Sequence, residues 1–381
     1  MELLFASTPA PGHLEPILSL AHIALARGDE AICLTGAHLA DSVRAAGVRF
    51  APLPPAAGLD FRKMEEIYPE IVSMPPGPVR IRFSFERAFL DPMPAQAEAL
   101  RELIELENPD VVVTDSARIG AGVDAMVTEP IRHYLDQKLV DLGVPALNLS
   151  PWDAMVLTND VYLHPSVPEF EYPFSPTPEL VRFIGVLPSL PRKGVVHPDW
   201  WHEIEEGRPV VLVTQGTWAN FDFGELVEPA LEALGDRHDV LVLVTTGGRP
   251  VENVKNAHAP NVRVAEFLDY RALLPKLSLL VTNGGYRTVS LALKAGVPVV
   301  ASGRTEDRAE VGARVAWSGV GLQVSSTPPL AAELREAITR VLTEPSFRER
   351  AKLVSASLAA IDTPREVIAI LDSLVTRSRR H

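Results

Sequence analysis

The strongest candidate for an anion-binding site in this chain is a glycine turn, Asn283-Gly284-Gly285. It follows the apolar run 277–282, which is typical of a buried strand, and precedes a segment with helical periodicity. Glycine lets a ligand approach the backbone closely, and the first N–H groups of a helix have no partner within the helix. Such a turn binds phosphate with those N–H groups and the positive end of the helix dipole, and Thr288 offers a hydroxyl beside it.

Two carboxylates, Glu306 and Asp307, come shortly after the next apolar run, 297–302. The carboxyl ends of parallel strands share one edge of an open α/β sheet, and ligands bind along that edge. A phosphate site beside two carboxylates predicts a ligand in which a nucleotide is joined to a group rich in hydroxyls.

A histidine and an aspartate occupy similar positions in the first half of the chain. His13 lies in a loop between a predicted strand, 2–7, and a helix from about 16 to 27, and Asp115 directly follows the predicted strand 110–114. Both side chains are therefore expected at one edge of a sheet. A histidine here can also be a loop or helix-capping residue, and the aspartate can simply cap the next element.

The strands and helices expected to position these groups alternate along the chain, which predicts an α/β protein. At 381 residues the chain is too long for one core of ordinary size, so we expect two domains. Short apolar runs typical of buried strands occur at 2–7, 31–35, 48–53, 110–114, 144–149, 210–214, 240–245, 262–268, 277–282 and 297–302. Helical spacing marks the intervals and the C-terminal segments 331–342, 345–359 and 364–375.

Composition excludes several classes of protein. The single cysteine, Cys33, excludes an internal disulfide framework, and a net charge of −13 argues against a nucleic-acid partner. No stretch approaches the ~20 apolar residues of a membrane span, and the N-terminus lacks the pattern of a secretory signal. We expect a cytoplasmic protein. The absence of Asp-x-Asp and of paired histidines at helical spacing predicts that no metal is bound.

The segment around the glycine turn resembles the donor-binding signature of the GT-B glycosyltransferases, in the family of plant and antibiotic-pathway enzymes. That signature runs His-Gly-Gly, a variable pair, Ser/Thr, then Glu-Ala-Leu, Ala-Gly-Val-Pro and Asp-Gln. This chain reads Asn283-Gly284-Gly285-Tyr286-Arg287-Thr288, Leu291-Ala292-Leu293, Ala295-Gly296-Val297-Pro298 and Asp307-Arg308. The opening Gly12-His13-x-x-Pro16 also resembles the family, and the likeness is strong over 1–30 and 208–325.

The resemblance implies two facing Rossmann-like domains, with a C-terminal helix that crosses back to the first. The expected divisions are an acceptor-binding domain at 1–190, a donor-binding domain at 205–362 and the returning helix at 363–381. The family's general base corresponds to His13, and the aspartate that orients it corresponds to Asp115. The residues that the resemblance assigns to the nucleotide-sugar are Gly12, Thr217, Phe267, Leu268, Asn283, Gly284, Gly285, Arg287, Thr288, Glu306 and Asp307.

Three positions depart from the family pattern. Asn283 replaces the usual histidine but can still donate a hydrogen bond to phosphate. Leu291 replaces a glutamate and cannot receive the ribose hydroxyls, which favours a deoxyribose donor such as a dTDP-sugar over a UDP-sugar. Arg308 replaces a glutamine, and it either contacts the sugar or faces solvent.

Residues 54–95 are rich in proline and in large apolar side chains. Such a segment either lines a pocket for an apolar ligand or forms a helical excursion with a small core of its own. We take as acceptor-binding candidates the apolar side chains Phe61, Met64, Phe83, Phe85, Phe89 and Trp152.

Together these features predict an inverting glycosyltransferase that moves a sugar from a UDP- or dTDP-sugar to a hydroxyl of a small, largely apolar acceptor. We expect no cofactor beside the nucleotide-sugar co-substrate, and a monomer or homodimer. Two alternatives stay open. One is a nucleotide-sugar epimerase of the same fold, and the other is a non-catalytic, transferase-like helper protein.

Overall fold

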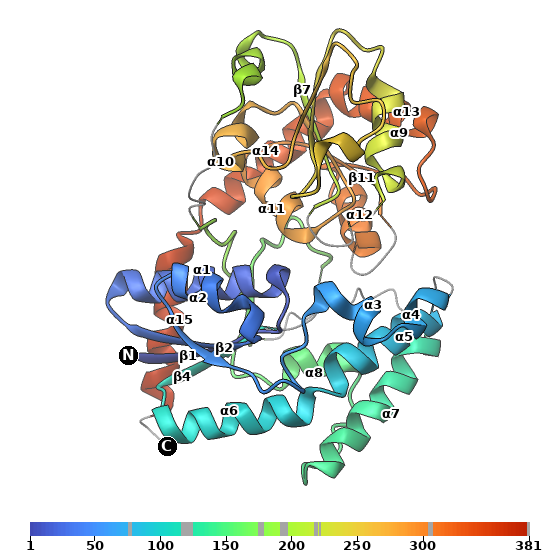
Figure 1. The fold of residues 1–381 in the computed structure, drawn as a ribbon. Coiled ribbons are helices and arrows are strands. Elements are labelled where there is room, and N and C mark those ends of the chain that lie inside the picture. The colour runs from blue at the N-terminus through green and yellow to red at the C-terminus, as the bar shows by residue number, and fades with distance from the viewer. Residues whose placement is uncertain are drawn as a thin grey trace.

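The computed structural model describes residues 1–74, 78–115, 125–173, 179–190, 197–216, 220, 222–303 and 308–378. They form two lobes, one above the other, and each lobe is built around a parallel sheet (Figure 1). The N-terminal half makes the lower lobe, and most of the C-terminal half makes the upper one. The two-domain α/β fold expected from the sequence is confirmed.

The lower lobe contains a four-stranded sheet in the order β3-β2-β1-β4, with every pair of neighbours parallel. β1 and β2 are buried and almost entirely apolar, as expected for parallel strands covered by helices. The elements of this half are β1 (Glu2–Ala6), α1 (Pro11–Arg27), β2 (Glu30–Thr35), α2 (Ala40–Ala45), β3 (Arg49–Pro52), α3 (Met64–Ile67), α4 (Glu70–Ser73), α5 (Pro78–Phe85), a π-helical turn (Glu86–Leu90), α6 (Met93–Glu107), β4 (Val111–Thr114), α7 (Ala125–Asp141), α8 (Pro151–Leu157), β5 (Tyr162–His164) and β6 (Val181–Phe183).

The proline-rich segment between β3 and α6 is mostly helical. α3, α5 and the π-helical turn contribute to two small apolar clusters, which agrees with the interpretation as a helical excursion. One cluster centres on Phe85 and Ile131. The other combines Phe61 and Ala88 with Ala10, the residue that precedes α1, so this excursion lies beside the first strand-to-helix connection.

The predicted strand at 144–149 is wrong. The backbone N–H groups of Leu147 and Asn148 donate to one oxygen of Asp136, on α7, at 2.9 and 3.3 Å. Asn148 also has a φ of +54°, a left-handed conformation that does not fit in a strand. A carboxylate from the preceding helix has therefore replaced a neighbouring strand as the partner of these backbone groups.

The upper lobe contains a six-stranded parallel sheet in the order β12-β11-β10-β7-β8-β9. β10 lies near its middle and pairs with β7 and β11, so the residues that follow β10 emerge beside the ends of two other strands. The elements of this half are β7 (Val210–Thr214), α9 (Val227–Leu234), β8 (Leu241–Thr245), β9 (Val262–Ala265), α10 (Tyr270–Leu273), β10 (Leu279–Thr282), α11 (Tyr286–Lys294), β11 (Val299–Ala301), α12 (Arg308–Trp317), β12 (Gly321–Gln323), α13 (Ala331–Thr343) and α14 (Pro345–Ala359).

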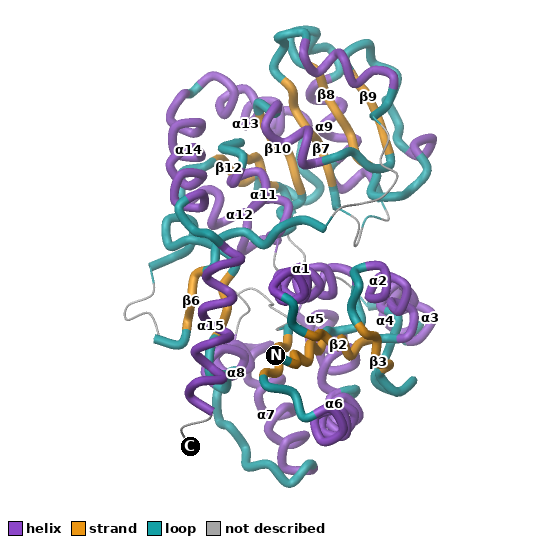
Figure 2. Tube along the Cα trace, turned by 90° about the vertical axis from the view of Figure 1, so that its left-hand side faces the viewer, coloured by secondary structure: helices purple, strands orange, loops and turns teal. Residues whose placement is uncertain are grey.

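The last helix, α15 (Thr363–Ser378), leaves the upper lobe and packs on the lower one. Figures 1 and 2 both show it descending beside the lower sheet. Val367, Ile370 and Leu371 are buried in the same core as Leu3 and Ile17, which confirms the predicted crossing helix.

The segment that connects the lobes, which includes β5 and β6, is shared between their cores. Val167 and Phe170 are buried in the core of the upper lobe, whereas Ile184 and Leu187 are buried in that of the lower lobe. The connection is therefore a packed layer between the lobes. Within the described part of the chain, no helix combines the length and the apolar character needed to cross a membrane.

Candidate active site

His13 and Asp115 meet at the carboxyl edge of the lower sheet. β1 and β4 are parallel neighbours, with Ala6 beside Thr114, so the residues after both strands emerge together. Nδ1 of His13 lies 2.5 Å from Oδ2 of Asp115. The other carboxylate oxygen accepts a hydrogen bond from the backbone N–H of Thr8 at 2.7 Å. The aspartate is thus held by the backbone on one side while it contacts the imidazole on the other.

His13 belongs to the first turn of α1 and does not lie in a loop. The sequence predicts a helix from about Pro16. In the structure the helix begins at Pro11, and Ala10 before it is extended. Proline is favourable at this first position because the missing N–H would have no partner in the helix anyway. The early start matters because it gives the imidazole a helical backbone as its support.

The contact with Asp115 sets the chemistry of the imidazole. An ionised carboxylate only accepts hydrogen bonds, so Nδ1 carries the proton and Nε2 is the acceptor of the neutral ring. The His13 side chain is 30% exposed, and that of Asp115 is 13% exposed. The pair is therefore sheltered but accessible, and Nε2 can take a proton from a hydroxyl.

Aromatic rings lie beside this histidine. Phe89, on the π-helical turn, has its ring centroid 6.3 Å from that of His13. Phe61 meets Phe89 edge to face at 5.6 Å, and Phe85 lies 5.2 Å from it. Phe61 and Phe85 are buried, whereas Phe89 is half-buried, so Phe89 is the ring that a ligand near the imidazole can reach.

The other predicted acceptor residues have different surroundings. Met64 packs against the cluster that contains Phe61. Phe83 packs against Tyr68 at 6.1 Å, and the guanidinium of Arg87 lies over its ring. Trp152 is in α8, but its side chain is outside the described part of the structure.

In the upper lobe, the glycine turn follows β10 and precedes α11 as predicted. Gly284 has a φ of +95°, and a Cβ there would lie 3.0 Å from the carbonyl oxygen of Arg308. A Cβ on Gly303 would lie 2.0 Å from the carbonyl oxygen of Asn283. Two chain segments therefore approach through their backbones, which only glycine allows. Gly285 is the residue before the first turn of α11, and Thr288 is half-buried within that helix.

Asn283 connects this turn to the one after β7. Its side chain is 6% exposed, and Nδ2 donates to the carbonyl oxygen of Gln215 at 2.6 Å. The resemblance predicts that this amide can also donate a hydrogen bond to phosphate. In the structure it stabilises the arrangement of the two turns.

Glycines that the sequence analysis did not assign complete the carboxyl edge of the upper sheet. A Cβ on Gly247 would lie 2.3 Å from the carbonyl oxygen of Gly216, and one on Gly248 would lie 2.9 Å from the ring of Phe267. Phe267 is 41% exposed, so its ring lies against this backbone with one side open, whereas Leu268 is buried in the core. A pair of glycines directly after a buried strand was the signal that could have identified this feature.

Arg287 and Glu15 join the two halves of the site. Arg287, on α11, donates to Oε1 of Glu15 at 3.1 Å, and Ser189 Oγ lies 3.5 Å from the same guanidinium. Glu15 comes two residues after His13 on α1. Figure 1 shows α1 along the top of the lower lobe, facing α11 and α12. The helix that carries the imidazole and the helix that follows the glycine turn thus begin opposite each other.

Two of the remaining residues are buried or half-buried, and three lie outside the described part of the chain. Arg308 is 6% exposed, so it does not face solvent. Leu291 is half-buried and packs against the core of the upper lobe. Thr217, Glu306 and Asp307 lie outside the described residues.

The chain is similar in sequence to known glycosyltransferases. Residues 230–374 match the family model described as erythromycin biosynthesis protein CIII-like, C-terminal domain. The chain is 32% identical over 423 residues to 4'-demethylrebeccamycin synthase of Lentzea aerocolonigenes, and the match covers 98% of this chain and 99% of that protein. The chain belongs to the natural-product glycosyltransferases of the family 1 type.

Solved structures of glycosyltransferases share the fold of this transferase. The glycosyltransferase SnogD of Streptomyces nogalater has a TM-score of 0.68 at 24% identity, covering 98% of this chain and 99% of that one. The glycosyltransferase VinC in complex with dTDP has a TM-score of 0.69 at 20% identity, covering 99% and 100%. At this level of identity the likeness establishes the GT-B fold alone.

We expect Gly284→Ala to destabilise this glycosyltransferase by about 1–3 kcal/mol, because alanine is strained at positive φ and its Cβ would press on Arg308. Gly285→Ala is the matched control, since Gly285 has a φ of −58° and only Thr288 Oγ1 lies as near as 4.0 Å. Chemical unfolding of both variants measures the difference. An equal loss in both would contradict the strain at Gly284.

Proposed function

We propose that this enzyme is an inverting glycosyltransferase that moves a sugar from a UDP- or dTDP-sugar to a hydroxyl of a small, largely apolar acceptor. One observation carries the proposal. The 2.5 Å pair of His13 and Asp115 lies at the start of α1, and Glu15, two residues after His13, forms an ion pair with Arg287 in the first turn of α11. The proposed general base and the proposed diphosphate-binding turn therefore face the same region between the lobes.

In the proposed reaction His13 acts as the general base. Its Nε2 takes the proton of the acceptor hydroxyl as the acceptor oxygen attacks the anomeric carbon. The bond between that carbon and the diphosphate breaks on the opposite face, so the product has inverted configuration and the nucleoside diphosphate leaves. Asp115 stabilises the imidazolium that forms, as the third member of a hydrolytic triad does.

The charge that develops on the leaving diphosphate is met by the N-terminus of α11. No side chain caps the start of α11, so its first N–H groups have no partner within the helix, and the helix dipole favours negative charge there. Such preorganised donors typically contribute about 10²–10³ to a rate. The proposal requires neither a metal nor a cofactor. Glu306, Asp307 and Thr217 are proposed to contact the donor, as the family resemblance implies.

We expect His13→Ala to lower kcat by about 10²–10⁴ while the affinity for nucleoside diphosphate is retained, because the imidazole acts on the acceptor side. Asp115→Asn should lower kcat in the same way, since an amide favours the wrong tautomer of the imidazole. Steady-state kinetics and calorimetry separate the two effects. The control is His22→Ala, an exposed histidine on the same helix. Unchanged kcat in His13→Ala would overturn the proposed role.

For the donor we propose a dTDP-sugar in preference to a UDP-sugar. Leu291 stands where the family has a glutamate for the ribose hydroxyls, and its side chain packs on the core. The related glycosyltransferase VinC was solved with dTDP. Calorimetry with dTDP, UDP and GDP should show dTDP binding about fivefold tighter than UDP, the effect of one hydrogen bond of about 1 kcal/mol. Tighter binding of UDP would exclude this preference.

For the acceptor we propose a flat, largely apolar alcohol that lies against Phe89. Because burying such a ring contributes about 1.5–3 kcal/mol, Phe89→Ala should raise the acceptor KM about tenfold and leave the donor KM unchanged. Phe83→Ala is the comparison, since that ring contacts Tyr68 and Arg87. Initial rates with an aromatic alcohol measure both. Equal effects from the two variants, or tight binding of only a polar oligosaccharide, would remove the proposal.

A further inference from the structure

A buried carboxylate lies in the packed layer between the lobes. Glu171, in the segment between β5 and β6, is only 1% exposed. It takes no part in the proposed chemistry. A buried charge is costly unless it is paired and hydrogen-bonded, so its partners show what it holds in place.

Those partners come from the connecting segment itself and from the upper lobe. Within its own segment, Ser166 Oγ donates to Glu171 Oε1 at 3.1 Å, and Nε2 of His164 lies 3.3 Å from the same oxygen. From the upper lobe, the hydroxyl of Tyr286 donates to Oε1 at 2.5 Å, and Nε of Arg314 donates to Oε2 at 2.9 Å. One carboxylate therefore joins three segments of the chain.

The charge of Glu171 is strongly stabilised. Burial alone would raise the pKa of this carboxyl, but the contacts with His164, the hydroxyl of Tyr286 and the charge of Arg314 outweigh it and lower the pKa to about 2. The group is therefore a carboxylate at every pH at which the enzyme would be assayed. Arg314 has a second acidic neighbour, Glu310, at 3.6 Å.

The two upper-lobe partners lie on the helices that border the donor site. Tyr286 is the first residue of α11 and follows the glycine turn directly. Arg314 lies in α12, which begins at Arg308, against whose carbonyl Gly284 is packed. A shift of either helix would therefore move the backbone of the turn.

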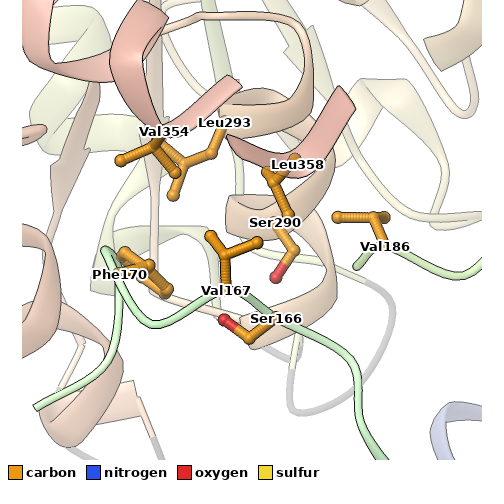
Figure 3. A pocket seen from close by; sticks show the side chains of 8 residues that line it. All are labelled: Ser166, Val167, Phe170, Val186, Ser290, Leu293, Val354 and Leu358. Atoms are coloured by element: carbon orange, nitrogen blue, oxygen red, sulfur yellow. The ribbon is translucent and has the colours of Figure 1, made fainter. Parts of the chain in front are cut away.

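The segment that carries the carboxylate is tightly packed against the upper lobe. Beside it, Ser166, Val167 and Phe170 of the connecting segment meet Ser290 of α11 and Leu358 of α14 (Figure 3). The pocket that these side chains line has no room for a molecule of the size of water.

We propose that Glu171 is a positioning residue for the donor site, which acts through Tyr286 and Arg314 to fix α11 and α12 in the arrangement that binds the donor diphosphate. This inference rests on the proposed function of the glycine turn. Its consequence is that donor affinity is set in part by a group in the connecting segment, which does not touch the donor.

The mildest test is Tyr286→Phe, which removes one hydroxyl and keeps the ring. A hydrogen bond to a charged group contributes about 1.5–3 kcal/mol, so its loss should raise the dissociation constant for dTDP, and the donor KM, about tenfold. The acceptor KM and the kcat at saturating donor should stay within about twofold, which a general loss of folded enzyme would not produce. Glu171→Gln should raise the same constants further, because Arg314 then lacks its carboxylate.

The matched control is Ser290→Ala, on the same helix and in the same packed layer. Its hydroxyl donates to the carbonyl oxygen of Tyr286 at 2.8 Å within the helix and not to Glu171, so dTDP affinity should stay at the wild-type value. All titrations are done well below the unfolding temperature of each variant. If Glu171→Gln does not fold, Tyr286→Phe alone decides.

Wild-type dTDP affinity in Tyr286→Phe, whether or not the unfolding temperature falls, would overturn the positioning role and leave the proposed function intact. If the wild-type enzyme binds neither dTDP nor UDP, the proposed function fails and the inference fails with it. The two failures are distinguished by the wild-type titration.

Discussion

In a parallel sheet every strand ends at the same edge, and this structure places two such edges opposite each other. The first turns of α1 and α11 begin at those edges and are joined by the ion pair of Glu15 and Arg287. The start of α11 has no side-chain cap, so its first N–H groups and the positive end of its dipole favour an anion there, whereas the start of α1 carries the imidazole of His13. The proposed chemistry depends on this arrangement. It places the imidazole of the lower lobe opposite the proposed anion-binding turn of the upper lobe.

Precision at the two edges comes from different physical sources. In the lower lobe it comes from a side-chain pair, since Asp115 is held by the backbone of Thr8 and in turn contacts His13. In the upper lobe it comes from backbone packing. Gly284 and Gly303 allow two chain segments to approach more closely than any side chain would permit. One half of the site is therefore sensitive to charge and the other to volume.

The layer between the lobes does more than connect them. It contributes apolar side chains to both cores, and it buries the carboxylate of Glu171 against α11 and α12, the helices of the proposed donor site. Because separating a buried ion pair leaves an uncompensated charge, a movement of these helices away from Glu171 is costly. The crossing of α15 onto the lower core adds a second, apolar connection between the lobes.

The sequence by itself determined the periodic elements, because buried strands and amphipathic helices depend on local residue patterns. Nine of the ten expected strands are present, and so are the crossing helix and the glycine turn between β10 and α11. The exception is 144–149, which is not a strand because its backbone N–H groups donate to Asp136, a carboxylate of the preceding helix. The start of α1 was misplaced because Pro11 was not recognised as a first helical residue.

Only the tertiary structure decided which polar groups meet. No local pattern shows that Asn283 bonds to Gln215, that Arg287 pairs with Glu15, or that the ring of Phe89 lies beside His13. Glu171 contacts Tyr286 and Arg314, which lie more than a hundred positions further along the chain. Contacts of this kind depend on how the packed layers are stacked, and stacking is fixed by the burial of side chains from the whole chain at once.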